Sequence, residues 1–192
     1  MTRLIALYKP FEVLCQFSAD GSGKRTLAEF IDQPGVYPAG RLDFKSEGLL
    51  LLTDNGRLQH RIAHPSRKLI KRYLVQVEGR PGETDLQQLA DGIRIREHGR
   101  EHVARVRSAR LISPPALPDR TPPVTPHRAE RSSWIDLELG TGINRQIRRS
   151  LAALGYPVLR LVRQSVGPWT LEALAPGAWQ EVNPSLADAR GR

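Results

Sequence analysis

The stretch from residue 40 to residue 56 constrains the fold of this chain more than any other part of the sequence. It places Asp43 in a short polar turn between two cationic residues, and a run of four leucines, Leu49 to Leu52, follows. An apolar run this short, bounded by turn residues, predicts a buried strand and not a helix. The following pair, Asn55-Gly56, predicts a tight hairpin turn. Asp43 would therefore stand at the mouth of a rigid strand, where a reactive group can be held in place.

Charge and cysteine content narrow the class of protein. The 192 residues include 29 Lys and Arg against 20 Asp and Glu, a formal net charge of +9. Such an excess favours a polyanionic partner such as nucleic acid, although a soluble basic protein without one has the same balance. The single cysteine excludes an internal disulfide and suits a reducing cytosol. We therefore expect a cytoplasmic protein.

Three further kinds of signal are absent from the sequence. No apolar run reaches membrane-spanning length, and the N-terminus lacks a secretory pattern. The five histidines are scattered and show no metal-ligand spacing. We therefore expect no membrane association and no metal.

Short strands dominate the chain, with a few helices between them, which predicts an α+β fold with a largely antiparallel sheet. A helix capped by Thr84 should end at Gly92. The other expected helices cover residues 27–31, 58–63 and 144–154. The expected strands cover residues 4–8, 13–17, 71–78, 93–95, 103–112, 134–139 and 158–162.

The segment 113–131 contains six prolines and four arginines or histidines, without periodicity. A loop of this length inside a domain is usually functional or disordered. We interpret it as a mobile, basic insertion that faces RNA, and an interdomain linker is the alternative. The catalytic domain would span residues 1–183, and the small, polar residues 184–192 would form a flexible tail.

The late helix, residues 144–154, carries an arginine cluster. Ile147, Leu151 and Leu154 recur at helical spacing and should form its buried stripe. The adjoining faces carry Arg145, Arg148 and Arg149, near a helix start that would favour acids. Phosphate, solvent or a carboxylate such as Asp43 could neutralise these cations, and a solvated basic face remains the simpler reading.

Asp43 and Tyr73 also have simple structural readings. An aspartate in such a turn commonly caps backbone amides. Arg41 could form a surface ion pair, and Tyr73 could be a core aromatic whose hydroxyl reaches water. Each residue alone is weak evidence, but together they describe a basic protein with one placed carboxylate, an aromatic plate and an arginine cluster.

Four sequence blocks occur in an order that resembles a known family. They are Lys9-Pro10, the block from Tyr37 to Thr53, Lys71 to Val75, and Gly142 to Arg149. Together they resemble the signature of the RsuA-type ribosomal RNA pseudouridine synthases, from Leu4 to about Val182. Many relatives begin with an S4-type RNA-binding domain, for which there is no room before Leu4. In this respect the chain is similar to the E-type branch, which acts on large-subunit (23S) ribosomal RNA.

The resemblance implies a pseudouridine synthase fold, with a mixed sheet in two halves, a few flanking helices and an active-site cleft between the halves. It implies an isomerase that converts a specific uridine to pseudouridine without metal or cofactor. Asp43 would be the essential catalytic carboxylate. The supporting residues would be Arg41, Tyr73, Ile147 and Arg148, and the RNA-binding residues Lys9, Arg145 and Arg149.

The resemblance implies large-subunit ribosomal RNA, free or partly assembled, as the partner, with no obligate protein partner. One alternative keeps the chemistry and changes the substrate to another structured RNA. A second is a non-catalytic RNA-binding module, although such a module has no use for an acid among cations. A third is a glycosidase that uses Asp43 as nucleophile, which would usually recruit a second carboxylate such as Glu47.

Overall fold

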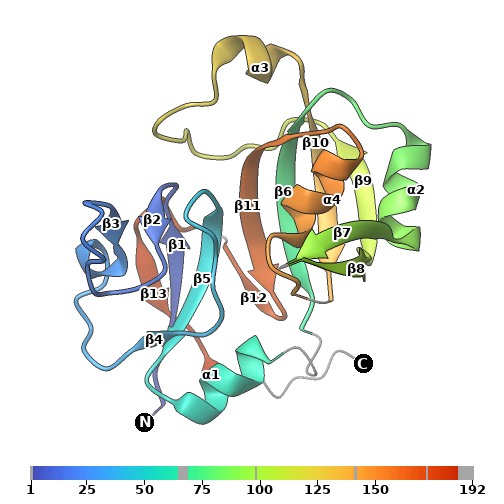
Figure 1. The fold of residues 1–192 in the computed structure, drawn as a ribbon. Coiled ribbons are helices and arrows are strands. Elements are labelled where there is room, and N and C mark those ends of the chain that lie inside the picture. Colours follow the sequence, from blue (N-terminus) through green and yellow to red (C-terminus); the bar gives the residue numbers. More distant parts are fainter. Residues whose placement is uncertain (1, 65–68, 98, 141, 172, 186–192) are drawn as a thin grey trace. The chain divides into compact units, whose positions relative to one another are not determined.

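The computed structural model describes residues 2–64, 69–97, 99–140, 142–171 and 173–185 (Figure 1). The chain divides into two compact units, one made of residues 1–69 with 162–192 and the other of residues 70–161. Strand β11, Val158–Val166, crosses the boundary.

The first unit is built on strands whose backbones pair mostly antiparallel (Figure 1). Their order is β13 (Trp179–Glu181), β1 (Leu4–Lys9), β5 (Glu47–Thr53) and the second part of β11. The edge strands β4 (Tyr37–Pro38) and β12 (Trp169–Thr170) pair antiparallel with β5 and β11. The pairing of β5 with β11 is parallel. Every residue of β1 and β5 is buried, which confirms the strand predicted from the four leucines.

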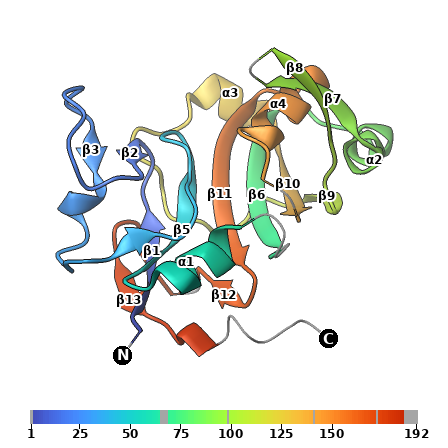
Figure 2. The same cartoon turned by 60° about the horizontal axis from the view of Figure 1, so that its bottom comes forward.

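The predicted hairpin at Asn55-Gly56 is wrong, because this pair begins a helix. Helix α1 spans Gly56–Ala63, and the Asn55 side chain accepts a hydrogen bond from the Leu58 N–H at 3.0 Å. Asn is among the preferred N-cap residues, so an Asn-Gly pair after a strand is compatible with either structure. Figure 2 shows α1 alongside β5.

The small elements near the N-terminus are shorter than expected. The strand expected over residues 13–17 is only β2 (Val13–Leu14), which pairs in parallel with β3 (Arg25–Thr26). The expected helix over 27–31 is a 3₁₀ turn, Leu27–Glu29. Beside it, Thr26 donates its hydroxyl to the Phe17 carbonyl at 3.2 Å.

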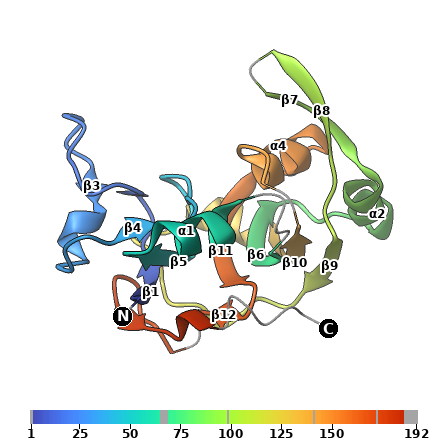
Figure 3. The same cartoon turned by 90° about the horizontal axis from the view of Figure 1, so that it is seen from below.

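The second unit contains strands in the order β11 (its first part), β6 (Lys71–Glu78), β10 (Ser132–Leu139) and β9 (Ser108–Ile112). The pairings of β10 with β6 and with β9 are antiparallel. A separate antiparallel hairpin is formed by β7 (Ile93–Glu97) and β8 (Arg100–Ala104). Figure 3 shows this hairpin extending away from the β6–β10–β9 strands, beside helix α4 (Gln146–Ala153).

Three expectations for the second unit require correction. The strand expected over 103–112 is interrupted and forms the end of β8 and all of β9. Helix α2 spans Glu83–Asp91, and its N-cap is Gly82, so Thr84 lies in the first turn. Helix α4 begins at Gln146, because Arg145 adopts a left-handed conformation with φ 52°. Of the expected stripe, Ile147 and Leu151 are buried, and Leu154 is half-buried.

The proline-rich segment 113–131 ends in a short helix, α3 (Pro126–Glu130), that the sequence analysis did not predict. Arginine side chains tie the segment to the second unit. Arg120 donates to the Leu159 carbonyl at 3.1 Å, and Arg160 donates to the Pro118 carbonyl at 2.7 Å. Within the described residues, no helix is long and apolar enough to cross a membrane. The predicted tail, 184–192, lies outside the described residues from position 186 onward.

The described elements confirm the predicted fold class, α+β with a largely antiparallel sheet.

Candidate active site

The Asp43 turn is fixed by backbone hydrogen bonds on three sides. The Ser46 N–H donates to the Asp43 carbonyl at 3.0 Å, which closes the turn. Glu12 donates its N–H to the Phe44 carbonyl at 2.9 Å, and the Leu42 N–H contacts the sulfur of the single cysteine at 3.3 Å. The Asp43 side chain is half-buried. The carboxylate therefore sits on a backbone with little freedom, as the sequence predicted.

A buried arginine that the sequence analysis did not single out supports this turn. Arg163, on β11, is 3% exposed. Its Nε donates to the Leu49 carbonyl at 2.7 Å, and its Nη1 approaches the Arg41 carbonyl at 3.4 Å. These two carbonyls lie on either side of the Asp43 turn, so one guanidinium spans it. The sequence signal was weak, because Arg163 follows directly after the expected strand 158–162, where an arginine is usually exposed.

Gly48 allows β5 and β11 to approach each other closely. Its φ is +102°, and a Cβ at this position would lie 2.4 Å from the carbonyl oxygen of Arg163 and 2.6 Å from its nitrogen. Both the backbone angle and the space require glycine here. The approach brings the Arg163 side chain under the Asp43 turn.

Lys9 is buried, and the prediction that it contacts RNA is wrong. Its side chain is 0% exposed, and its Nζ donates to the carbonyls of Pro10 and Val13, both at 2.8 Å. Burial lowers the pKa of Lys9 to about 8, against the opposing effects of Cys15, Glu47 and Asp43. A phosphate cannot reach an ammonium in this position, so Lys9 is an internal support of the Asp43 region.

Tyr73, Ile147 and Arg148 lie in the second unit. Tyr73 is buried on β6, opposite Leu137 of β10. Ile147 is buried on α4, and Arg148 follows it, with its Nη1 3.2 Å from the Val158 carbonyl. Tyr73 and the two α4 residues thus belong to the second unit, while Arg41, Asp43 and Lys9 belong to the first.

The remaining predicted cations differ in exposure. Arg41, beside Asp43, is exposed, and so is Arg145, whose left-handed backbone precedes α4. Arg149 is half-buried, and its Nη2 is 3.4 Å from Asn144 Oδ1. Arg41 and Arg145 therefore have the accessibility that a phosphate contact needs.

A second charged cluster, which the sequence analysis missed, lies on β6, β9 and β10. Asp136 is 6% exposed, and Arg72 contacts its two oxygens at 2.7 and 2.9 Å. Arg110 contacts the second oxygen at 2.7 Å. Burial would raise the pKa of Asp136, but the hydrogen bonds from the two guanidinium groups outweigh it and lower the pKa. The sequence predicted a strand over residues 134–139, and the structure shows that the Asp136 side chain on this strand is enclosed by its two arginine partners.

The Asp43 region holds one carboxylate on a rigid turn, with the buried amine of Lys9 near it. Such a group can act as a nucleophile or as a base. Among the described residues, no three or more His, Cys, Asp or Glu side chains gather as a metal ion would need.

Comparison with known proteins gives a consistent result. The family model described as RNA pseudouridylate synthase matches residues 3–153. A protein of Xanthomonas campestris named ribosomal large subunit pseudouridine synthase E is 48% identical over 92% of this chain and 94% of its own length. A protein of the same name from Vibrio vulnificus is 44% identical over 94% of this chain and 75% of its own length.

A solved structure titled as a pseudouridylate synthase is also similar, with a TM-score of 0.75 and 28% identity, covering 98% of this chain and 73% of that one. A human RNA pseudouridylate synthase domain containing protein, at 16% identity and a TM-score of 0.55, shares the fold. The motif order, the placed carboxylate and the extent of these matches lead to one conclusion: this chain belongs to the RNA pseudouridine synthase family.

Proposed function

We propose that this chain converts one uridine of large-subunit ribosomal RNA to pseudouridine. The assignment of the substrate rests on the similarity to relatives named ribosomal large subunit pseudouridine synthase E. Four of them are 42–49% identical to this chain over 90–94% of its length. A ribosomal RNA substrate would place the activity in the cytoplasm.

The reaction is an isomerisation. The bond between N1 of uracil and the ribose carbon breaks, the base turns, and C5 bonds to the same carbon. The proton leaves C5 and N1 ends protonated, so no atom is gained or lost. We assign Asp43 as the essential carboxylate in its ionised form. It would either attack the ribose carbon or remove a proton from the sugar.

The rigidity of the Asp43 turn supports this assignment. The turn is closed by its own hydrogen bond and held on both sides by the Arg163 guanidinium. A reactive group held in this way needs little reorganisation to reach its attacking position. The buried Lys9 ammonium interacts electrostatically with Asp43, which places a cation near the turn.

The roles proposed for the other residues follow the family resemblance. Arg148 would pair with the aspartate, Tyr73 would stack on the target base and Ile147 would pack against the nucleotide. The base must leave its helix to be reached, and Arg41 would fill the gap or hold a phosphate. The exposed Arg145, together with Arg149 and the basic segment 113–131, would contact the RNA backbone.

The decisive experiment compares Asp43→Asn with Asp54→Asn. Asp54 is exposed and accepts a hydrogen bond from the Arg3 N–H at 2.9 Å, so its replacement removes the same charge from the same unit away from the turn. Pseudouridine is measured in ribosomal RNA transcripts as tritium released from C5-labelled uridine. We expect Asp43→Asn to abolish product while RNA binding survives, and Asp54→Asn to retain activity.

Substantial turnover by Asp43→Asn would refute the assignment of Asp43. Release of free uracil in place of a retained isomer would support the glycosidase alternative. Pseudouridine mapped in total RNA from cells with and without the gene tests the substrate. Loss at one large-subunit position supports the proposal, and loss in another RNA contradicts it.

A further inference from the structure

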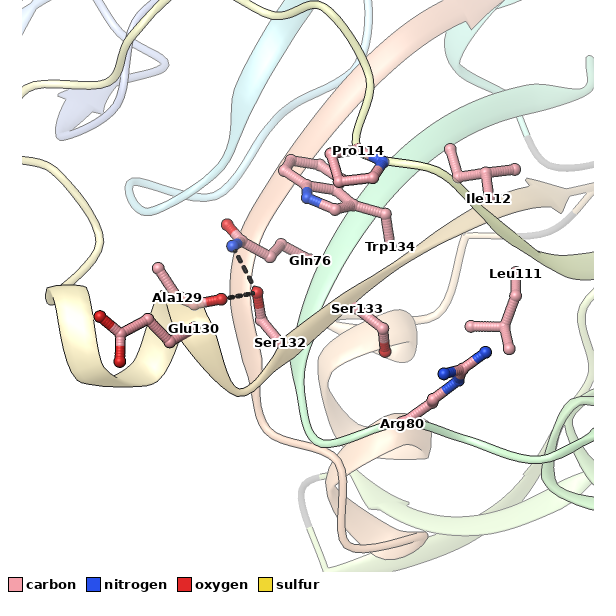
Figure 4. Close-up of a pocket in the computed structure, with 10 residues that line it drawn as sticks. All are labelled: Gln76, Arg80, Leu111, Ile112, Pro114, Ala129, Glu130, Ser132, Ser133 and Trp134. Carbon is pink, nitrogen blue, oxygen red and sulfur yellow. Dashed lines mark hydrogen bonds between the residues drawn. The ribbon is translucent and has the colours of Figure 1, made fainter.

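A cavity of about 520 Å³ lies in the second unit, at the ends of β6, β9 and β10 (Figure 4). Its lining combines an aromatic side chain, Trp134, with the amide of Gln76 and the hydroxyl of Ser132. The apolar side chains of Ile112 and Pro114 also line the cavity. An aromatic plate with a few fixed polar groups is the lining that a small planar ligand needs.

The polar groups of the cavity are held in place. The Gln76 side chain donates to Ser132 Oγ at 2.8 Å, and Ser132 Oγ donates to the Ala129 carbonyl at 2.6 Å (Figure 4). The Gln76 amide also has a carbonyl acceptor and a second N–H. An amide with both a donor and an acceptor can pair with the edge of a nucleobase. Trp134 is 8% exposed, so the ligand would meet only part of its ring.

The Arg72–Asp136–Arg110 cluster lies on the same face of the strands. Trp134 pairs with Gln76 and Ile112, and Asp136, two residues further along β10, pairs with Leu74 and Arg110. Residues two apart on a strand share a face and are separated by ~7 Å. Arg110, opposite Asp136, therefore begins about one nucleotide's reach from the tryptophan. Arg72, opposite Glu138, begins two residues further along the strands, and its side chain reaches back to Asp136.

The cluster can bind an anion. Arg110 has a side chain that is 70% exposed and Arg72 one that is 46% exposed, although both hold the buried Asp136. The carboxylate uses only some of the N–H groups of each guanidinium, and the others remain to meet a phosphate. The buried acid thus fixes the direction of two exposed cations.

Glu130 is an acid at the cavity and opposes an anionic ligand. It belongs to α3, and Figure 4 shows its carboxylate at the far side of the group from Ile112 and Trp134. A ligand with its base in the cavity and its phosphate on Arg110 would keep the phosphate away from this acid.

We propose that this face of the second unit binds an unpaired nucleotide of the substrate RNA, with the base in the Trp134 cavity and the phosphate on Arg110 and Arg72. The site lies on the face of β6 opposite Tyr73, because residues 72, 74 and 76 alternate with residue 73. It rests on the proposed function for its RNA partner. It adds a single-strand contact to the site that would receive the target uridine.

The first test uses Arg110→Gln, with Arg96→Gln as the matched control. Arg110 is on a strand at the end of the β11–β6–β10–β9 order, and Asp136 keeps its contacts to Arg72, so the fold should survive. Arg96, on the β7–β8 hairpin, has a side chain that is 81% exposed, and its replacement by glutamine removes the same charge. The probes are a labelled single-stranded oligouridylate and an RNA duplex of equal length, with binding measured by fluorescence anisotropy.

We expect Arg110→Gln to weaken single-strand binding about tenfold and to reduce the slope of affinity against salt by about one. Arg96→Gln should change the affinity for the single strand less than about twofold. The two variants should have equal affinities for the duplex. Equal losses from the two variants, or an unchanged affinity for Arg110→Gln, would overturn the proposal.

The second test locates the base. A ribosomal RNA transcript containing 5-iodouridine is cross-linked to the wild-type protein by light, and the attached peptide is identified by mass spectrometry. Attachment to the peptide that contains Trp134 supports the cavity, and attachment only to other peptides contradicts it.

Pseudouridine formation is measured separately. Normal isomerisation by Arg110→Gln with unchanged KM would remove this site and leave the proposed function standing. RNA binding that depends on Arg110, found without isomerase activity, would support this site and contradict the proposed function.

Discussion

Gly48→Ala tests the close approach of β5 and β11 on which the Asp43 turn depends. The added Cβ would lie 2.4 Å from the Arg163 carbonyl oxygen, and that oxygen is backbone, which cannot swing aside. The backbone angle, φ +102°, costs a side chain about 2 kcal/mol, and the overpacking adds about 2 kcal/mol. The total loss of unfolding free energy is about 4 kcal/mol, or about 8–16 °C in Tm for a chain of this size.

Gly56→Ala is the matched control for this substitution. Gly56 is the first residue of α1, and an added Cβ would meet no heavy atom within 4 Å. Alanine should stabilise this position by ~0.5 kcal/mol, because it reduces the freedom of the unfolded chain. The two variants differ by one methyl group each and should shift Tm in opposite directions.

The assay is thermal unfolding followed by circular dichroism, with pseudouridine formation measured well below both transitions. Gly48→Ala should also lose activity at a temperature where it remains folded, because displacement of Arg163 would release the carbonyl of Arg41. A Gly48→Ala protein that melts within a degree of Gly56→Ala would refute the argument from close approach.

Two other substitutions test features that the sequence did not reveal. Asn55→Ala removes the N-cap of α1 and should cost about 1 kcal/mol in urea unfolding; an unchanged midpoint would contradict the capping role. Asp136→Asn should cost about 1.5–3 kcal/mol at neutral pH by weakening the bonds to Arg72 and Arg110. Because the folded-state pKa of Asp136 is lowered, its contribution is present above the unfolded value of about 3.9 and is lost as pH falls through the folded value. The stability difference between wild type and variant should therefore shrink on acidification, and a constant difference down to strongly acid pH would contradict the assignment.

Patterns within one element were predictable from the sequence. The four leucines fixed a buried strand, and the alternation from Lys71 to Glu78 gave β6 with the same bounds. Asp43 was singled out as the candidate carboxylate because the turn, the strand and the family motif agree at that position. These are local signals, and each depends on residues that are close in the chain.

Features that depend on distant pairing were not predictable. Arg163 supports the Asp43 turn because β11 pairs in parallel with β5, and no local pattern marks that partnership. Lys9 was expected to contact RNA from the family resemblance, yet β1 lies between β13 and β5, and this distant pairing buries the Lys9 side chain. Asn55-Gly56 satisfies both a hairpin and a helix cap, and the tertiary structure selects the cap.

The first unit is assembled from both ends of the chain, which affects the order of its biosynthesis. The Asp43 turn is made early, but the guanidinium that spans it belongs to residue 163. A nascent chain therefore carries Asp43 on an incompletely supported loop until residue 163 has been synthesised and β11 has paired with β5. The geometry of this turn therefore matures late relative to its own synthesis, and a chain that stops before residue 163 would present the aspartate without its guanidinium support.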